Sequence, residues 1–364
     1  MIAQGAVAGP APASRSAPQA GWWRWLRAHV FATPLDGALA LLLLALAGYA
    51  LPKVARWAFT DSVVVADQPS ACAAASGACW AVIHAHARSI IFGLYPYAEQ
   101  WRAGVALVLV AVALAVTFAV GARRPRRTLT LWVVTATAFV VLMGGGILGL
   151  APVATDDWGG LPLTIFVFIA TVLIGFPLAL LLALGRGARL PVVRGVCTAA
   201  IEVVRAMPIL TILFCAAIVV PLMLPEWLNP GKIWRVVLAM AFFYACFQAE
   251  IVRGGLQGVP RGQREAALSL GFTPLQTWLH VELPQALRYT VPATVSQVVV
   301  ALKDTSMLLV VGLFDFLASA NTAITRDEWA RYYVELYLFV AAAFLLMTTV
   351  LGALERRFVR KPAP

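Results

Sequence analysis

The sequence has few charged residues. Only 12% of its 364 residues are Asp, Glu, Lys or Arg, whereas 61% are hydrophobic. About a quarter of an average soluble domain is charged. A soluble fold of this length has too small an interior to cover so much apolar surface, and the mean hydropathy is +0.84. The composition therefore excludes a soluble enzyme, a disordered chain and a basic nucleic-acid-binding domain, and it favours a polytopic membrane protein.

Acidic residues are scarcer than basic ones, with 17 Asp and Glu against 28 Lys and Arg, so the net charge is +11. The basic residues are scattered between apolar runs instead of forming one patch, so we expect no nucleic-acid partner. Lys and Arg accumulate in the cytoplasmic loops of membrane proteins. The excess of positive charge is thus interpreted as an orientation signal.

Apolar runs long enough to cross a membrane recur along the chain, since a spanning helix needs roughly 20 residues. The run at 306–320 could be a ninth span or a helix that does not cross. A ninth span would place the basic C-terminal tail outside, so we favour the second alternative, with both termini in the cytoplasm. The sequence then predicts eight spans, at 36–52, 103–121, 128–150, 161–184, 206–224, 233–250, 286–302 and 334–354.

The two parts of the chain differ in the polarity of their apolar runs. Polar groups lie within or beside the runs at 160–355, but seldom within those at 1–155. We expect no cleavable signal peptide, and we expect function in the second part. The predicted regions are a disordered tail with an interfacial Trp/Arg segment at 1–35, a three-span extension at 36–155 with an external segment at 53–102, a transmembrane core at 160–355 and a cytoplasmic tail at 356–364.

Cysteine is scarce, with five residues. Cys197, Cys215 and Cys246 lie in or beside apolar runs and are interpreted as packing residues. Cys72 and Cys79 share the external segment, where a disulfide is one of two alternatives because spacing alone does not fix the geometry. The four histidines are scattered, so we expect no metal site.

One cytoplasmic loop, at 251–286, carries residues at a distinctive spacing. The stretch 263–270 favours a helix, Gly271 suits its C-terminus, and Pro274 suits the start of a second helix. The loop is therefore predicted to be two short helices joined at a glycine. The residues that define the spacing are Glu265, Ala266, Ala267, Gly271, Val281, Leu283 and Pro284.

This spacing resembles the signature loop of the permease subunits of binding-protein-dependent ABC importers. That signature is Glu-Ala-Ala, three residues, Gly, nine residues, Ile, any residue and Leu-Pro, and the chain departs from it only at Val281. Stretches that resemble polar-amino-acid permeases begin at Ile201, Ala249 and Lys303, with Ala206 in place of a usual Gly. The resemblance covers about 160–355. The longer N-terminal part looks like that of general L-amino-acid permeases.

The resemblance implies an all-α, polytopic membrane bundle of about eight spans, with a type I (MetI-like) permease core in the C-terminal half. It implies translocation of amino acids across the bacterial cytoplasmic membrane, without covalent chemistry in this chain. The sequence has no Gly-x-x-x-x-Gly-Lys-Ser/Thr stretch. ATP and Mg would therefore bind to a partner dimer of ATPase subunits at the loop. Further implied partners are a periplasmic amino-acid-binding protein and a second permease, for which a sister chain is favoured over a second copy.

Ionisable and amide groups near the membrane are candidates for a gate or substrate path, although the charged ones could simply anchor helix ends. The two Glu-x-x-Arg sets place each Glu and Arg on one helix face, where they can pair. The candidates are Glu202, Arg205, Gln248, Glu250, Arg253, Ser296, Gln297, Lys303 and Asp304.

Two other classes of membrane protein compete with this interpretation. A secondary, ion-coupled amino-acid transporter would need buried charges and internal inverted repeats. A membrane-bound enzyme or sensor would need a cluster of His, Cys or acidic residues at one membrane face. Neither class accounts for the spacing of the 251–286 loop.

Overall fold

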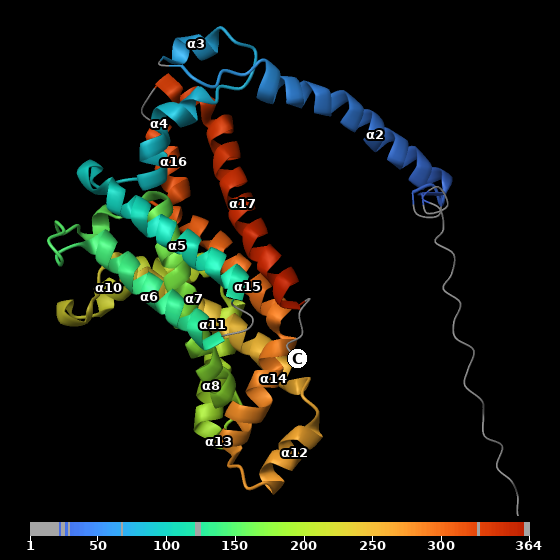
Figure 1. Ribbon diagram of the computed structural model, residues 1–364, viewed down its shortest axis with the longest axis vertical. Coiled ribbons are helices and arrows are strands. Elements are labelled where there is room, and N and C mark those ends of the chain that lie inside the picture. The colour runs from blue at the N-terminus through green and yellow to red at the C-terminus, as the bar shows by residue number, and fades with distance from the viewer. Residues whose placement is uncertain are drawn as a thin grey trace, which may run out of the picture. The chain divides into compact units, whose positions relative to one another are not determined.

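The computed structural model describes residues 22, 26–27, 30–66, 68–120, 125–325 and 328–359. These residues form helices and connecting segments without a named β-strand, and an isolated bridge joins Gly160 and Asp315. The all-α prediction is confirmed (Figure 1). The chain forms two compact units, Met1–Val63 with Cys72–Ala78, and Val64–Ala71 with Cys79–Pro364.

The first unit is built on α2 (Pro34–Ala55), which continues as the π-helix η1 (Arg56–Thr60). Thr33 caps its N-terminus in a capping box with Asp36, and Pro34 occupies the first turn. The predicted span at 36–52 is confirmed, but the helix runs on to Thr60. The helix thus includes residues 53–60 of the segment 53–102 that is predicted to be external.

The second unit contains six helices that are long and apolar enough to cross a membrane. With the helix of the first unit they make seven among the described residues, or eight if one bent helix pair is a single span. The principal helices are α5 (Gln100–Val120), α6 (Pro125–Gly144), α7 (Gly160–Arg186), α11 (Lys232–Gln257), α15 (Val291–Asp304) with η8 (Thr305–Val311), and α17 (Tyr333–Val359).

The bent pair corrects the prediction of a single span at 206–224. Helix α8 (Pro191–Ala206) ends before Met207, which is extended because Pro208 follows it. The chain then continues as α9 (Ile209–Phe214), η5 (Cys215–Val219) and α10 (Val220–Met223). The two parts are bent by 108°.

Two other predicted boundaries are wrong for local reasons. Helix α6 ends at Gly144, not residue 150, because Gly145 and Gly146 have positive φ. A span starting at 286 is excluded because α14 (Leu283–Tyr289) ends before Pro292, so this span runs over Val291–Val311. The run at 306–320 is divided at Gly312 (φ +71°).

Short helices surround the end of the second unit at which α7 begins. Helix α4 (Ala81–Phe92) packs on α7, α16 (Phe316–Thr325) and α17. The remaining short elements are α3 (Pro69–Ala73), η2 (Tyr97–Glu99), η4 (Thr155–Asp157), η6 (Glu226–Leu228) and η9 (Glu328–Tyr332). The segment at 53–102 is thus largely helical, although its sequence shows little periodicity.

Helix α16 has only 10 residues, too few to cross a membrane. Its N-terminus is capped by Asp315, whose carboxylate accepts the backbone N–H of Ala318 at 3.0 Å. Burial raises the pKa of this carboxyl group, and the backbone hydrogen bonds oppose that rise. The prediction that 306–320 does not form a further span agrees with this geometry.

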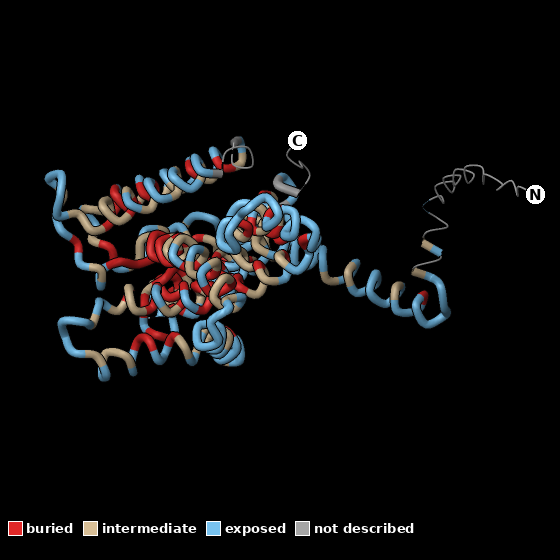
Figure 2. The backbone as a smooth tube through the Cα atoms, turned by 90° about the horizontal axis from the view of Figure 1, so that it is seen from below, coloured by how far each residue is buried: buried red, intermediate tan, exposed pale blue. Residues whose placement is uncertain are grey.

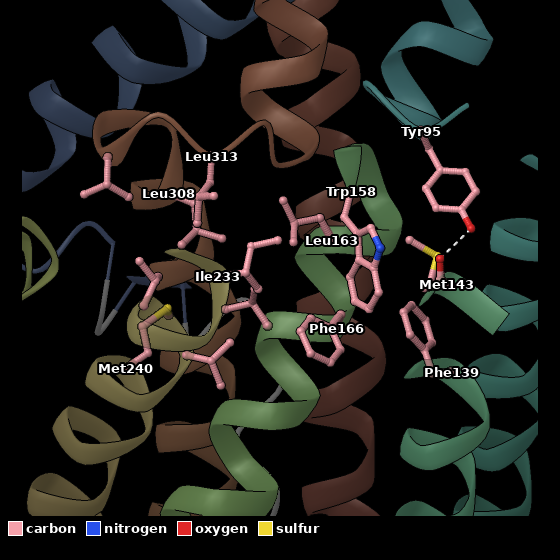
Figure 3. Packing of buried hydrophobic residues seen from close by; sticks show 14 of the residues in the cluster. Tyr95, Phe139, Met143, Trp158, Leu163, Phe166, Ile233, Met240, Leu308 and Leu313 are labelled. Atoms are coloured by element: carbon pink, nitrogen blue, oxygen red, sulfur yellow. Dashed lines mark hydrogen bonds between the residues drawn. The ribbon is translucent and has the colours of Figure 1, made fainter. Parts of the chain in front are cut away.

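The main hydrophobic core joins α5, α6, α7 and α11 (Figure 3). Phe166 is at its centre, with edge-to-face contacts to Trp158 at 5.1 Å and Trp234 at 5.6 Å between ring centroids. Figure 2 shows the buried residues gathered on the inner helices of the second unit. The outer helices carry many exposed apolar side chains, as lipid-facing surfaces do.

Helices α7 and α11 pack closely at Gly175. A Cβ atom at this position would lie 2.7 Å from the carbonyl oxygen of Ala241 and from Cδ1 of Tyr244. Because a Cβ never comes so near to a backbone oxygen, only glycine allows this approach.

We expect Gly175→Leu to separate α7 from α11 and to lower the free energy of unfolding by about 1–3 kcal/mol, the usual cost of overpacking. Gly104→Leu is the matched control, because nothing lies within 4 Å of a Cβ at Gly104. The measurement is the midpoint of thermal unfolding in detergent. Equal midpoints for both variants would contradict the close packing.

Candidate functional site

The loop between α11 and α15 forms a compact helical hairpin. Helix α11 extends to Gln257, so the loop itself starts seven residues after the predicted residue 251. It contains α12 (Arg261–Ser269), α13 (Pro274–Thr277) and the π-helix η7 (Trp278–Glu282), and α14 completes it. Figure 1 shows α12 and α13 at the same end of the second unit as α8.

The first hairpin helix ends in a Schellman motif at Gly271, whose φ is +84°. The N–H of Gly271 donates to the carbonyl oxygen of Leu268 at 3.0 Å, and that of Phe272 donates to Ala267 at 3.1 Å. These two bonds satisfy carbonyl groups that the helix end leaves unpaired. The prediction of a helix terminus at Gly271 is confirmed.

The second hairpin helix starts at Pro274, as predicted. Thr273 caps it, and its hydroxyl group accepts the backbone N–H of Gln276 at 3.3 Å. The side chain of Gln276 accepts the N–H of Thr273 at 2.9 Å in return. The turn between α12 and α13 is therefore held by the Schellman motif on the α12 side and by the capping box on the α13 side.

The inner face of the hairpin holds its two arms together. Ala267, Thr277 and Leu283 are buried. Arg264 of α12 forms an ion pair of 3.8 Å with Glu282 of η7. Among the residues of the predicted spacing, Val281 is half-buried and Pro284 is exposed.

The outer face of the hairpin combines a carboxylate with apolar side chains. Glu265 and Ala266 are exposed, and so are Leu268, Leu270 and Phe272. Glu265 is the fifth residue of α12, beyond the first turn in which the helix dipole favours a carboxylate. Its carboxylate is instead free to meet a basic group of a partner.

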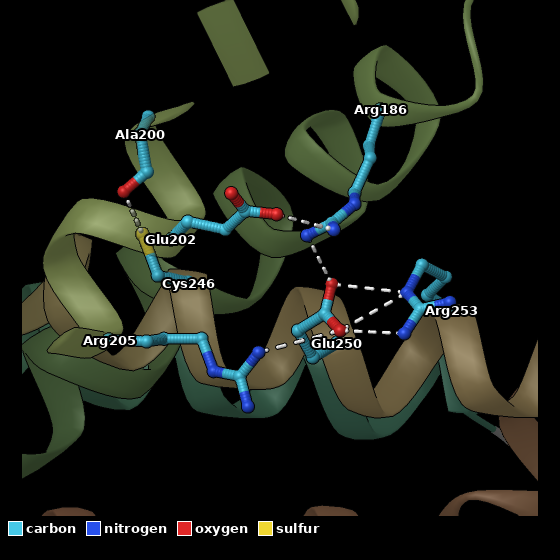
Figure 4. Close-up of polar contacts among 7 residues, drawn as sticks. All are labelled: Arg186, Ala200, Glu202, Arg205, Cys246, Glu250 and Arg253. Carbon is cyan, nitrogen blue, oxygen red and sulfur yellow. Dashed lines mark hydrogen bonds and ion pairs between the residues drawn. The ribbon is translucent and has the colours of Figure 1, made fainter. Parts of the chain in front are cut away.

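A cluster of ionised side chains lies where the ends of α7, α8 and α11 meet (Figure 4). The carboxylate of Glu250 on α11 receives Arg253 at 2.8 Å and Arg186, the last residue of α7, at 2.7 Å. Arg205, in the last turn of α8, lies 3.5 Å from the same carboxylate. One acidic group thus joins three helices through charge-assisted contacts.

The two Glu-x-x-Arg sets behave differently. Glu250 pairs with Arg253 within its helix, as the spacing predicts. Glu202 pairs with Arg186 at 3.0 Å instead of with Arg205, so that predicted pair is wrong. The packing of α8 on α11 turns Arg205 toward Glu250 and the ring of Phe247.

Gln248 is fully buried, and its amide donates to the hydroxyl oxygen of Thr294 at 2.8 Å. Its carbonyl oxygen Oε1 has no hydrogen-bond partner among the described residues. Ser296 is exposed and Gln297 is half-buried on α15, the helix that carries Thr294. Among the α15 side chains, the hydrogen bond with Gln248 is thus made by Thr294.

Lys303 and Asp304 lie at the far end of α15 from the cluster. Lys303 is exposed and Asp304 is half-buried, and the described residues show no ion pair between these two side chains. The structure therefore does not join them to the residues around Glu250.

Sequence reasoning missed Arg186 and Thr294. Arg186 looks like an orientation signal at the end of an apolar run, yet it bridges both predicted glutamates. No local sequence pattern identifies Thr294, because its hydrogen bond with Gln248 joins residues that are distant in sequence.

The cysteines divide into two groups. Cys197, Cys215 and Cys246 are free thiols. Cys72 and Cys79 are buried and belong to different units, so their disulfide stays a prediction. The described ranges contain no group of three or more metal-ligating side chains.

Comparisons with known proteins place this chain among membrane transport components. Residues 175–363 match the family "Binding-protein-dependent transport system inner membrane component". The chain is 34% identical to the "Inner membrane amino-acid ABC transporter permease protein YhdY" of Escherichia coli (strain K12), over 96% of each chain. It is 30% identical to the "Glutamate/glutamine/aspartate/asparagine transport system permease protein BztC" of Rhodobacter capsulatus, over 97% of this chain and 95% of the relative.

A solved structure described as an amino acid ABC transporter with histidines is 30% identical, with a TM-score of 0.49. The likeness covers 55% of this chain and 91% of that one.

We expect Glu250→Gln to lower the free energy of unfolding by about 1–3 kcal/mol, because three guanidinium groups lose the negative charge and one of the two acceptor oxygens that they share. Glu202→Gln is the matched control. Glu202 is more exposed and has one basic partner, so its loss costs about 1 kcal/mol or less. Thermal unfolding in detergent measures both variants. An equal loss in the two would show that Glu250 does not organise the cluster.

Proposed function

The chain belongs to the family of binding-protein-dependent transport system inner membrane components, and we propose that it is the permease subunit of an ATP-driven importer of amino acids. The outer face of the α12–α13 hairpin is the observation that carries the proposal. It presents Glu265 beside exposed leucines on a rigid, doubly capped support. Such a surface suits docking of an ATPase subunit.

The hairpin is firmly connected to the bundle. Helix α14 approaches α11 so closely that a Cβ atom at Gly255 would lie 2.7 Å from the carbonyl oxygen of Ala286. Helix α11 also carries Glu250, which holds the ends of α7 and α8. A displacement of the docked hairpin would therefore pass to three helices together.

The proposed assembly follows from the family and from the sequence. ATP and Mg would bind to a separate pair of ATPase subunits, so this chain is a transport subunit and not an enzyme. A periplasmic binding protein would deliver the amino acid, and a sister permease would complete the path. The distribution of basic residues supports the proposal that the hairpin and both termini lie in the cytoplasm.

The proposed substrates are polar L-amino acids. Both relatives that match nearly the full chain have names that refer to amino-acid transport. The Escherichia coli protein is named an amino-acid ABC transporter permease, and the Rhodobacter capsulatus protein is named for glutamate, glutamine, aspartate and asparagine. The buried amide of Gln248 and the polar side chains of Ser296 and Gln297 are the proposed path residues. Uptake of a labelled amino-acid panel by the reconstituted complex identifies the range.

We expect Glu265→Lys to abolish co-purification with the ATPase and ATP-dependent uptake, because it reverses the charge at the docking face. The protein should still insert and unfold at the wild-type temperature, since Glu265 has no ion-pair partner among the described residues. Glu226→Lys, the same change at an exposed residue of η6, is the control and should keep the ATPase bound. Normal co-purification of Glu265→Lys would contradict the docking assignment.

A further inference from the structure

A cavity of about 650 Å³ lies beside the ion-pair cluster, and the proposed path residues Gln248, Ser296 and Gln297 do not line it. Its walls come from the end of α7, the following turn at 187–190, the end of α11 and the inner side of the hairpin. Its volume is within the range of cavities that hold small organic ligands.

The polar wall of the cavity is strongly basic. It contains four arginines, Arg186, Arg189, Arg253 and Arg264, and Glu282 is the one acidic residue among the lining side chains. Arg189 is exposed and has no ion-pair partner within the described ranges. Arg186 contacts Glu250 through Nη1 and Glu202 through Nη2, and Arg253 contacts Glu250 through Nε and Nη2. A guanidinium group has five N–H donors, so each arginine keeps donors for a further anion.

The other wall of the cavity is apolar and continues onto the surface of the bundle. Leu181 of α7 is 63% exposed, and Val193 of α8 is 40% exposed. On α8, the exposed residues Val192, Val196 and Val203 follow at helical spacing. An exposed apolar strip beside the ends of two candidate spans matches the boundary between acyl chains and headgroups.

We propose that this cavity binds the headgroup of an anionic phospholipid. The phosphodiester would accept hydrogen bonds from the arginines, which suit the planar, doubly donating geometry of phosphate recognition. The acyl chains would lie along Leu181 and Val193. Because the wall is basic, a headgroup that carries its own cation would be disfavoured. Basic pockets between spanning helices select anionic headgroups in this way.

The proposal does not depend on the transport function, because it concerns the free permease and its lipid. It would nevertheless link the lipid to the hairpin, since Arg264 and Glu282 join the hairpin arms and line the cavity.

Lipid retention by the purified full-length permease tests the proposal. The protein is titrated in detergent with dioleoylphosphatidylglycerol, and bound lipid is counted by native mass spectrometry. In separate experiments, dioleoylphosphatidylcholine is offered in place of this lipid, and inorganic phosphate is added as a competitor. Arg189→Gln removes an unpaired cavity arginine. Arg194→Gln is the matched control, because Arg194 is exposed on α8 and does not line the cavity.

We expect phosphatidylglycerol to bind to wild type and Arg194→Gln equally, and about fivefold more weakly to Arg189→Gln, the factor for one basic residue at an anionic lipid surface. Phosphatidylcholine should not replace it, and inorganic phosphate should not displace it. Equal binding to wild type and Arg189→Gln would overturn the proposal. Displacement by inorganic phosphate would assign the cavity to free anions and would also overturn the lipid site.

Discussion

The contacts of Glu250 are the constraint on which one end of the bundle depends. A single carboxylate accepts three guanidinium groups, which come from the end of α7, the last turn of α8 and the next turn of α11. Without this shared acceptor, three positive charges would face one another in a partly buried space. Helix α8 is bent by 108° from the helices that follow it, and the contact between Arg205 and Glu250 holds its end against α11.

Close backbone packing extends this constraint along α11. Gly175 brings α7 against α11, and Gly255 brings α14 against the same helix. Helix α11 therefore contacts the hairpin on one side and the ion-pair cluster on the other. Its far end is fixed by the aromatic contacts around Phe166. In the proposed mechanism, a displacement of the hairpin would therefore reach α7 and α8 through α11.

The sequence predicted those features that depend on local residues. Long apolar runs indicated the spans, and Gly271 and Pro274 indicated the hairpin, because capping and turn preferences act within a few residues. Features that depend on packing were not predicted. Arg186 binds both Glu202 and Glu250 only because α7 and α8 converge, and the arginine-lined cavity exists only once the hairpin folds back. Span ends at Gly145 and Pro208 were missed because apolar composition continues past the backbone break.

The central claim is that this chain moves amino acids by the work of a docked ATPase instead of an ion gradient. The direct measurement is uptake of labelled glutamate and glutamine into vesicles that hold the complete transporter, with ATP supplied on the side of the hairpin and with sodium and proton ionophores present. The account predicts uptake that requires ATP and is unaffected by the ionophores. Uptake that runs on a sodium or proton gradient without the ATPase would contradict it.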